Sequence, residues 1–230
     1  MIRTAMIRPL VFLAALLIAQ PAAAFCKLAL VLGMDISSSV NALEYRLQIE
    51  GLAYALEKEE VIEAILTPEG AHIAATAYEW SGYQQQDLMI DWTILDSPAA
   101  IRAFAQRLRN HTRPYAEFPT AIGKALEFGA KRFDTAPPCG RQVIDLSGDG
   151  ENNVGVDPDY FRALGLFDGI TINGLVILGA FPNPAIYYRT HVMQGPDAFV
   201  AIARDFEEYR YVMTGKLLRE INAQTIIGAR

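Results

Sequence analysis

Three oxygen-bearing side chains follow one apolar stretch of the chain, and their spacing suits a metal ion. Residues 27–33 are predicted to form a strand buried on both faces of a sheet, because nearly all of them are apolar. Asp35, Ser37 and Ser39 come directly after it, at alternate positions. In a parallel α/β sheet, ligands bind in the loops that follow the carboxyl ends of the strands. Oxygen atoms are the ligands that a hard cation such as Mg²⁺ prefers, so the stretch predicts a cation site.

Two further polar side chains occupy comparable positions later in the chain. Thr120 begins a predicted helix after a polar loop, and Asp149 follows a predicted strand at residues 141–147. In the simpler alternative, Asp35 and Asp149 only cap turns or helices, and Thr120 is a helix N-cap. A shared metal site is favoured, because it explains all of these positions together.

The combined pattern resembles the von Willebrand factor type A (VWA) family. That family has a metal-ion-dependent adhesion site, or MIDAS, made of an Asp-x-Ser-x-Ser loop, a distant Thr and a distant Asp. Residues 35–39 match the first part, Thr120 the second and Asp149 the third. The amino-acid sequence of residues 35–40 and 146–152 is similar to that of a bacterial branch of the family, the DUF1194 group. The resemblance spans nearly all of the chain after an amino-terminal export signal.

This resemblance implies a role for each position. Ser37 and Ser39 would bind the metal directly through their hydroxyls. Thr120 would bind directly or through water, and Asp35 and Asp149 mostly through water. One coordination position would stay open for a partner's carboxylate, which neutral hydroxyl ligands favour because they leave the cation's charge incompletely neutralised. The expected cofactor is one divalent cation, Mg²⁺ first, with Mn²⁺ or Ca²⁺ as alternatives.

The amino end predicts export. Two arginines precede an apolar run at residues 9–19, and three alanines at residues 22–24 provide a cleavage site. The run is too short and wrongly flanked for a membrane span. We expect a signal peptide at residues 1–24, a single VWA-like domain at residues 25–230 without a membrane span, and a periplasmic or extracellular location.

Charge and cysteine content narrow the environment. The net charge of −6 over 230 residues argues against nucleic acid as a partner. Cys26 and Cys139 each precede a predicted strand, and the starts of neighbouring parallel strands lie side by side. A disulfide is therefore expected in an oxidising compartment, and two buried free thiols are the alternative.

Strands and helices are predicted to alternate, which defines an α/β fold. The predicted strands occupy residues 27–33, 71–80, 87–95, 141–147, 170–178 and 199–203. Predicted helices begin near Asn41 (running to about Glu60), Ser97, Thr120, Asp157 and Asp205. We expect a three-layer αβα, Rossmann-like (VWA) fold with a mainly parallel six-stranded sheet and helices on both faces. A turn at Ser81 and Gly82 makes one edge strand antiparallel.

A long loop at residues 179–196 leaves a strand on the same side of the sheet as the predicted metal. Tyr187, Tyr188 and Arg189 in this loop could contact a partner, because aromatic residues and arginine are enriched at interfaces. A surface loop without such a role is the alternative.

These features predict a secreted, non-enzymatic binding domain that recognises an acidic group on an unidentified protein partner through its metal. One alternative is a metal-assisted hydrolase, whose general base would be Asp145, Glu151 or His191. Another is a scaffold in which the metal is only structural. Asp145, inside a strand, is more simply expected to have a structural role.

Overall fold

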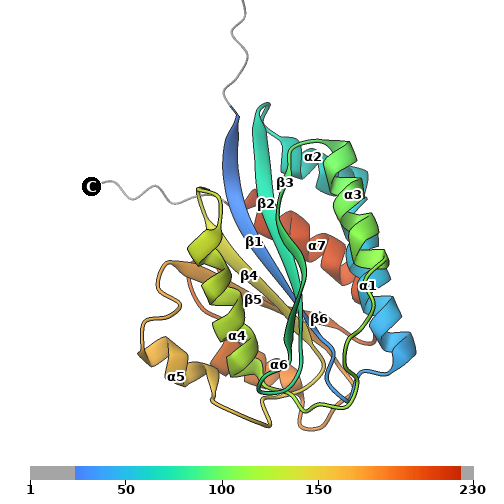
Figure 1. The fold of residues 1–230 in the computed structure, drawn as a ribbon, viewed down its shortest axis with the longest axis vertical. Coiled ribbons are helices and arrows are strands. Elements are labelled where there is room, and N and C mark those ends of the chain that lie inside the picture. Colours follow the sequence, from blue (N-terminus) through green and yellow to red (C-terminus); the bar gives the residue numbers. More distant parts are fainter. Residues whose placement is uncertain (1–23, 224–230) are drawn as a thin grey trace, which may run out of the picture.

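Strand β1 (Phe25–Asp35) lies in the interior of the sheet in the computed structural model, which describes residues 24–223 (Figure 1). Its second part, from Leu28 onward, is buried throughout, as expected for an apolar strand with neighbours on both edges and helices on both faces. The predicted signal peptide, residues 1–24, lies outside the described residues except for its last position.

Within residues 24–223, the sheet has six strands in the order β3-β2-β1-β4-β5-β6. The other strands are β2 (Ala71–Trp80), β3 (Gln86–Leu95), β4 (Gln142–Gly148), β5 (Ile170–Ile177) and β6 (Val200–Ala203). All neighbours are parallel except β2 and β3, which form the predicted antiparallel edge hairpin. Because the chain adds β2 on one side of β1 and β4 on the other, the loops after β1 and β4 diverge. They leave a crevice at the carboxyl ends of these two strands.

Helices cover both faces of the sheet, which confirms the three-layer α/β fold (Figure 1). One face carries α1 (Ala42–Leu56), α2 (Glu59–Leu66), α3 (Pro98–Arg109) and α7 (Tyr209–Asn222). The other carries α4 (Ile122–Lys131), α5 (Pro158–Ala163), α6 (Pro184–Tyr187) and the short turns η1 (Arg132–Thr135) and η2 (Tyr188–Val192). Among residues 24–223, none of the helices is both long and apolar enough to cross a membrane.

The first predicted helix is in fact two helices. It was expected to run to about Glu60, but α1 ends at Leu56 and α2 begins at Glu59. Continuing the buried face of α1 would bring glutamates into the core. The break instead exposes Glu59 and turns Val61 inward.

Two later segments also differ from expectation. The long loop at residues 179–196 contains α6 and η2, which a short segment rich in proline and glycine does not signal. Helix α7 begins at Tyr209, four residues after the predicted cap at Asp205, whose Oδ1 accepts a hydrogen bond from the N–H of Glu208 instead.

The predicted disulfide joins Cys26 and Cys139, whose Cα atoms are 4.6 Å apart. Cys26 lies at the start of β1, and Cys139 lies three residues before β4. Because these strands are parallel neighbours, the bridge lies at the amino ends of the sheet, opposite to the crevice.

Candidate metal centre

The loop after β1 places its polar side chains by local hydrogen bonds. The N–H of Ser37 donates to Oδ1 of Asp35 at 2.7 Å, which closes a tight turn at the end of the strand. The hydroxyl oxygens of Ser37 and Ser39 lie 3.1 Å apart. Asn41, rather than Asp35, caps helix α1, so capping of this helix does not explain the aspartate.

Asp149 reaches the same loop from β4. The hydroxyl of Ser39 donates to Oδ1 of Asp149 at 2.8 Å, although the two residues are 110 positions apart. The contact follows from the sheet, since Met34 pairs with Ser147 in the parallel register of β1 and β4. The carboxyl ends of the two strands therefore bring Asp35, Ser39 and Asp149 together at the crevice.

Thr120 lies beside Asp149 and its loop. Its N–H donates to Oδ1 of Asn153 at 2.9 Å, and its carbonyl accepts from the N–H of Asn153 at 2.9 Å. A Cβ atom at Gly150 would be 3.8 Å from the Thr120 hydroxyl oxygen, so this hydroxyl faces the residue after Asp149. The N-cap position of α4 belongs to Ala121, not to Thr120. The segments that carry the five predicted residues thus form one hydrogen-bonded unit.

Electrostatics at this unit favour a cation. Burial, with the nearby charge of Asp149, raises the pKa of Asp35 to about 7, and burial also raises the pKa of Asp149. No lysine or arginine within residues 24–223 forms an ion pair with either carboxylate. Oδ2 of Asp35 is buried and has no hydrogen-bond partner in the described part of the chain.

The oxygen atoms also have suitable spacing. The separations of 3.1 Å between Ser37 and Ser39 and 2.8 Å between Ser39 and Asp149 match the roughly 3 Å between adjacent oxygens around an octahedral Mg²⁺. The donor set consists of oxygens alone, which suits a hard cation. The residues therefore fit the divalent cation that the sequence pattern implies.

Two supporting side chains were missed by the sequence reasoning. Arg113 donates to the carbonyls of Ile36 at 2.8 Å and Ser37 at 3.1 Å. Gln48 donates from α1 to the carbonyl of Asp35 at 2.9 Å. Both hold the backbone of the loop, and contacts to backbone carbonyls leave no signature in sequence spacing. A glutamine on the inward face of an apolar helix was the only available signal.

The predicted partner rim needs a correction at Tyr188. Its side chain is fully buried on the α4 face of the sheet, so it cannot contact a partner directly. The alternating sides of a helical turn explain this, because Arg189 is exposed while Tyr188 points inward. Tyr187 is half-buried, and its hydroxyl donates to Oδ2 of Asp157 at 2.7 Å.

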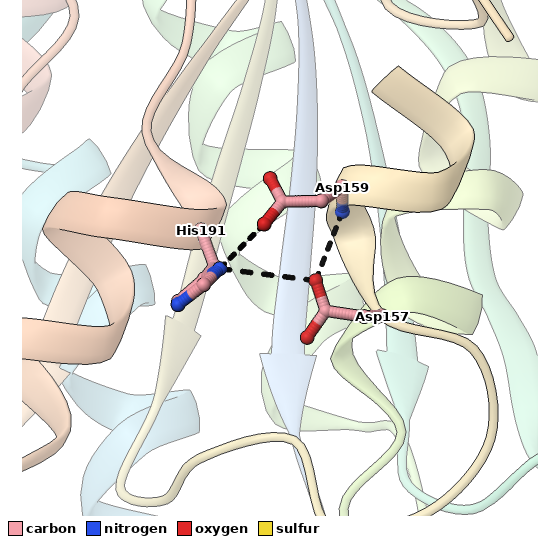
Figure 2. Close-up of side chains that lie close together, drawn as sticks. All are labelled: Asp157, Asp159 and His191. Carbon is pink, nitrogen blue, oxygen red and sulfur yellow. Dashed lines mark hydrogen bonds and ion pairs between the residues drawn. The ribbon is translucent and has the colours of Figure 1, made fainter. Parts of the chain in front are cut away.

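A second cluster of metal-ligating side chains joins α5 to η2 (Figure 2). Nδ1 of His191 lies 2.6 Å from Oδ2 of Asp159 and 3.8 Å from Oδ1 of Asp157. Both carboxylates already have other partners, because Oδ1 of Asp157 caps α5 through the N–H of Asp159, and Arg162 pairs with Oδ1 of Asp159. The cluster therefore acts as a clasp that fixes η2 against α5, and we call it the α5 clasp.

Asp145, for which a structural role was the simpler expectation, belongs to a buried ionic group. It lies in the interior, and its Oδ1 is 2.7 Å from Nζ of Lys216, a buried residue of α7. Nζ of Lys216 is also 2.5 Å from Oε1 of the buried Glu220. The sequence reasoning missed both α7 residues, since they interrupt an otherwise apolar stripe.

A groove of 430 Å³ lies beside the candidate centre and is lined by Ser39 and Asp149. The start of α1 contributes Leu43, which is 57% exposed, and Glu44. The far wall includes Glu207. A chain segment bound in this groove would lie next to the candidate metal ligands.

The fold and the arrangement of the crevice define a VWA-like domain. The chain belongs to the DUF1194 family, because the model of that family, described as a protein of unknown function, matches residues 25–225. A search of the curated proteins found no match.

Solved structures share the fold at low sequence identity. Proximal thread matrix protein 1 from the mussel byssus, solved with a zinc-occupied MIDAS motif, has a TM-score of 0.62 and 15% identity over 86% of this chain and 48% of its own. A von Willebrand factor type A protein from Catenulispora acidiphila has a TM-score of 0.58 and 19% identity over 86% and 44%. The pilus adhesin SpaC from Lactobacillus rhamnosus GG has a TM-score of 0.58 and 12% identity over 85% and 30%. The chain spans less than half of each protein, and the likeness establishes the fold alone.

Proposed function

We propose that this protein is an exported, non-enzymatic binding domain that holds one divalent cation, Mg²⁺ first, and uses it to recognise a carboxylate on a protein partner. Ser37 and Ser39 would bind the cation through their hydroxyls, with Thr120 binding directly or through water. Asp35 and Asp149 would hold the water molecules of its shell. When bound, the cation supplies the positive charge that attracts the partner's carboxylate.

One observation carries the proposal. Ser39, from the loop after β1, donates to Asp149, from the end of β4, beside a buried Asp35 oxygen that lacks a partner within residues 24–223. Two carboxylates meet there with raised pKa values and no ion-pairing side chain in the described region. A cation at this point would neutralise them, which explains why the fold tolerates the arrangement.

The groove supports recognition that depends on the cation. Its acidic side chains, which include Glu44, Asp205 and Glu207, would repel an acidic partner unless a cation were present. The exposed Leu43 offers an apolar contact beside the candidate ligands. A pilus adhesin among the structural neighbours is consistent with a protein-binding role.

Export is part of the proposal. It rests on the arginine, apolar and alanine pattern at residues 1–24. The disulfide between Cys26 and Cys139 adds support, because such bonds persist in oxidising compartments.

Metal binding is tested by calorimetry of the exported protein with Mg²⁺, Mn²⁺, Ca²⁺ and Zn²⁺. Asp35→Ala is expected to abolish binding of all four ions, and Ser39→Ala, which removes an exposed hydroxyl, to weaken Mg²⁺ binding about tenfold or more. Asp134→Ala, an exposed carboxylate in η1, is the matched control and should bind as the unsubstituted protein does. Unchanged Mg²⁺ binding in both site variants would refute the assignment.

Partner recognition is tested by capture from the native envelope with Mg²⁺ and with chelator. A partner retained only with Mg²⁺, and lost with Ser39→Ala, supports the proposal. Equal capture in chelator would mean that the metal is only structural. Mg²⁺-dependent turnover in a phosphatase and esterase screen would mean that the domain is a hydrolase.

A further inference from the structure

Tyr188 lies in a slot that two glycines open in the sheet. A Cβ atom at Gly174 on β5 would be 2.6 Å from Cδ1 of the Tyr188 ring, and one at Gly148 on β4 would be 2.5 Å from its hydroxyl oxygen. Any side chain at either position would occupy the space of the tyrosine. The ring therefore packs directly on the backbone of β5, and its hydroxyl reaches the end of β4 beside the crevice.

The slot ends at the metal centre. The same position at Gly148 is 2.9 Å from Oδ2 of Asp35 and 3.2 Å from Cζ2 of Trp80. The Tyr188 hydroxyl oxygen and Oδ2 of Asp35 thus both lie within 2.9 Å of one point. They are either close enough for a hydrogen bond after a small rotation or within the span of one bridging water molecule.

These two buried groups complement each other. The Tyr188 hydroxyl and Oδ2 of Asp35 are both buried, and neither has a partner in residues 24–223. Nε1 of Trp80 is a further buried donor without a partner in this part of the chain. A phenol hydroxyl can donate a hydrogen bond, and an ionised carboxylate can only accept one. An unpaired donor and an unpaired acceptor, each costly to bury alone, become favourable when they meet.

We infer that Tyr188 is a positioning residue of the metal centre, whose hydroxyl supplies, directly or through one water molecule, the hydrogen bond that Oδ2 of Asp35 needs. Oδ1 is already held by the N–H of Ser37, so the second bond fixes the plane of the carboxylate. A fixed carboxylate presents the metal's water shell with one geometry, which raises metal affinity. This inference rests on the proposed function for its metal-dependent part.

The α5 clasp holds the tyrosine in place. The hydroxyl of Tyr187, the last residue of α6, donates to Asp157 just before Tyr188 in the chain. Three residues after Tyr188, His191 of η2 pairs with Asp159 (Figure 2). The backbone of Tyr188 is therefore attached to α5 from both directions. The clasp thereby gives the buried side chain a defined direction toward Asp35.

The test compares Tyr188→Phe with Tyr78→Phe, which removes the hydroxyl of another fully buried tyrosine that donates to the carbonyl of Ala125. Calorimetry with Mg²⁺ and Mn²⁺ should show affinity about tenfold lower in Tyr188→Phe and unchanged in Tyr78→Phe. Equal affinity in the two variants would overturn the inference, because a merely structural tyrosine would not change the metal's dissociation constant.

A second measurement separates this inference from the proposed function. Urea unfolding in chelator gives the unfolding equilibrium constants of Asp35→Asn, Tyr188→Phe and the double variant. The effects of the two single substitutions should be non-additive, so that the constant of the double variant differs about fivefold from the product of the single effects. The cycle of Asp35→Asn with Tyr78→Phe should be additive. Additivity in both cycles refutes the contact even where metal binds. If Asp35 and Tyr188 are coupled but the unsubstituted protein binds no metal, the contact between them is real. The proposed function is then refuted, and the positioning role with it.

Discussion

At the scale of single residues, the crevice depends on a glycine as much as on its oxygen-bearing side chains. Gly148 ends β4 directly before Asp149, and its missing side chain leaves room for the Tyr188 hydroxyl and the Asp35 carboxylate. The position could not hold a larger residue without moving one of these groups. Interiors are close-packed, so an added methyl group here must displace a neighbour.

Gly148→Ala is therefore expected to destabilise the metal-free protein by about 1–3 kcal/mol, the usual cost of overpacking. The loss should be smaller in a Tyr188→Phe background, because the nearest atom is then absent. Gly215→Ala is the matched control. Gly215 is exposed in α7 with open space around it, so alanine there should stabilise the protein by about 0.5–1 kcal/mol. Urea unfolding measures all three, and a Gly148→Ala protein as stable as the control would contradict the packing described.

At the scale of elements, β4 and α7 are joined by an ionic group of unusual charge. Asp145 of β4 and Glu220 of α7 share the ammonium of Lys216, and all three are buried. Two carboxylates and one ammonium leave one excess negative charge, which is costly in the interior. Burial, with the charge of Glu220, raises the pKa of Asp145 to about 7, so the group retains a proton at mildly acidic pH.

This proton makes stability depend on pH. The unfolded chain loses the Asp145 proton near pH 3.9, whereas the folded chain keeps it to about pH 7. The contribution of this proton to the free energy of unfolding is complete below the pKa of Asp145 in the unfolded chain. It is lost as the pH rises toward 7. Between pH 5 and 7, this proton makes the free energy of unfolding fall by at most about 1.4 kcal/mol per pH unit. Asp145→Asn should remove that fall.

Urea unfolding in chelator at pH 5, 6, 7 and 8 measures the difference from the unsubstituted protein. Asp134→Asn makes the same chemical change at an exposed position. It should leave the slope of the unfolding free energy against pH unchanged. Parallel pH profiles for Asp145→Asn and the unsubstituted protein would show that Asp145 is ionised throughout this range.

Several strands and helices could be predicted from the sequence, and one side chain could not be placed. The apolar runs of β1 and β5 predict buried strands, and Ser97 followed by proline marks the start of α3, so these features were anticipated. The candidate ligands at residues 35–39 and at Asp149 could be singled out because they follow strand ends. Tyr188 was misplaced because nothing in the sequence distinguishes it from Tyr187. Their difference depends on how η2 turns against the sheet, which tertiary packing decides.

At the scale of the molecule, the two ends of the sheet have separate tasks. The carboxyl ends of β1 and β4 carry the candidate centre, and the amino ends carry the disulfide (Figure 1). The strands between them are buried, and β1 in particular is a continuous apolar strand. Stabilisation at one end and ligand geometry at the other can therefore be separated by experiment.

Replacing both cysteines by serine, Cys26→Ser with Cys139→Ser, is expected to lower the free energy of unfolding by about 2–5 kcal/mol. The bridge joins residues 113 positions apart, so its loss frees a large loop in the unfolded chain. Mg²⁺ affinity by calorimetry should stay within about twofold, because the Ser39–Asp149 contact at the opposite end depends on the β1–β4 register, and the strand pairing persists without the bridge. The reduced unsubstituted protein is the control and should lose stability to the same extent. A folded double variant with tenfold weaker metal binding would show that the bridge transmits order along β1 to the crevice, and that the two ends of the sheet are not independent.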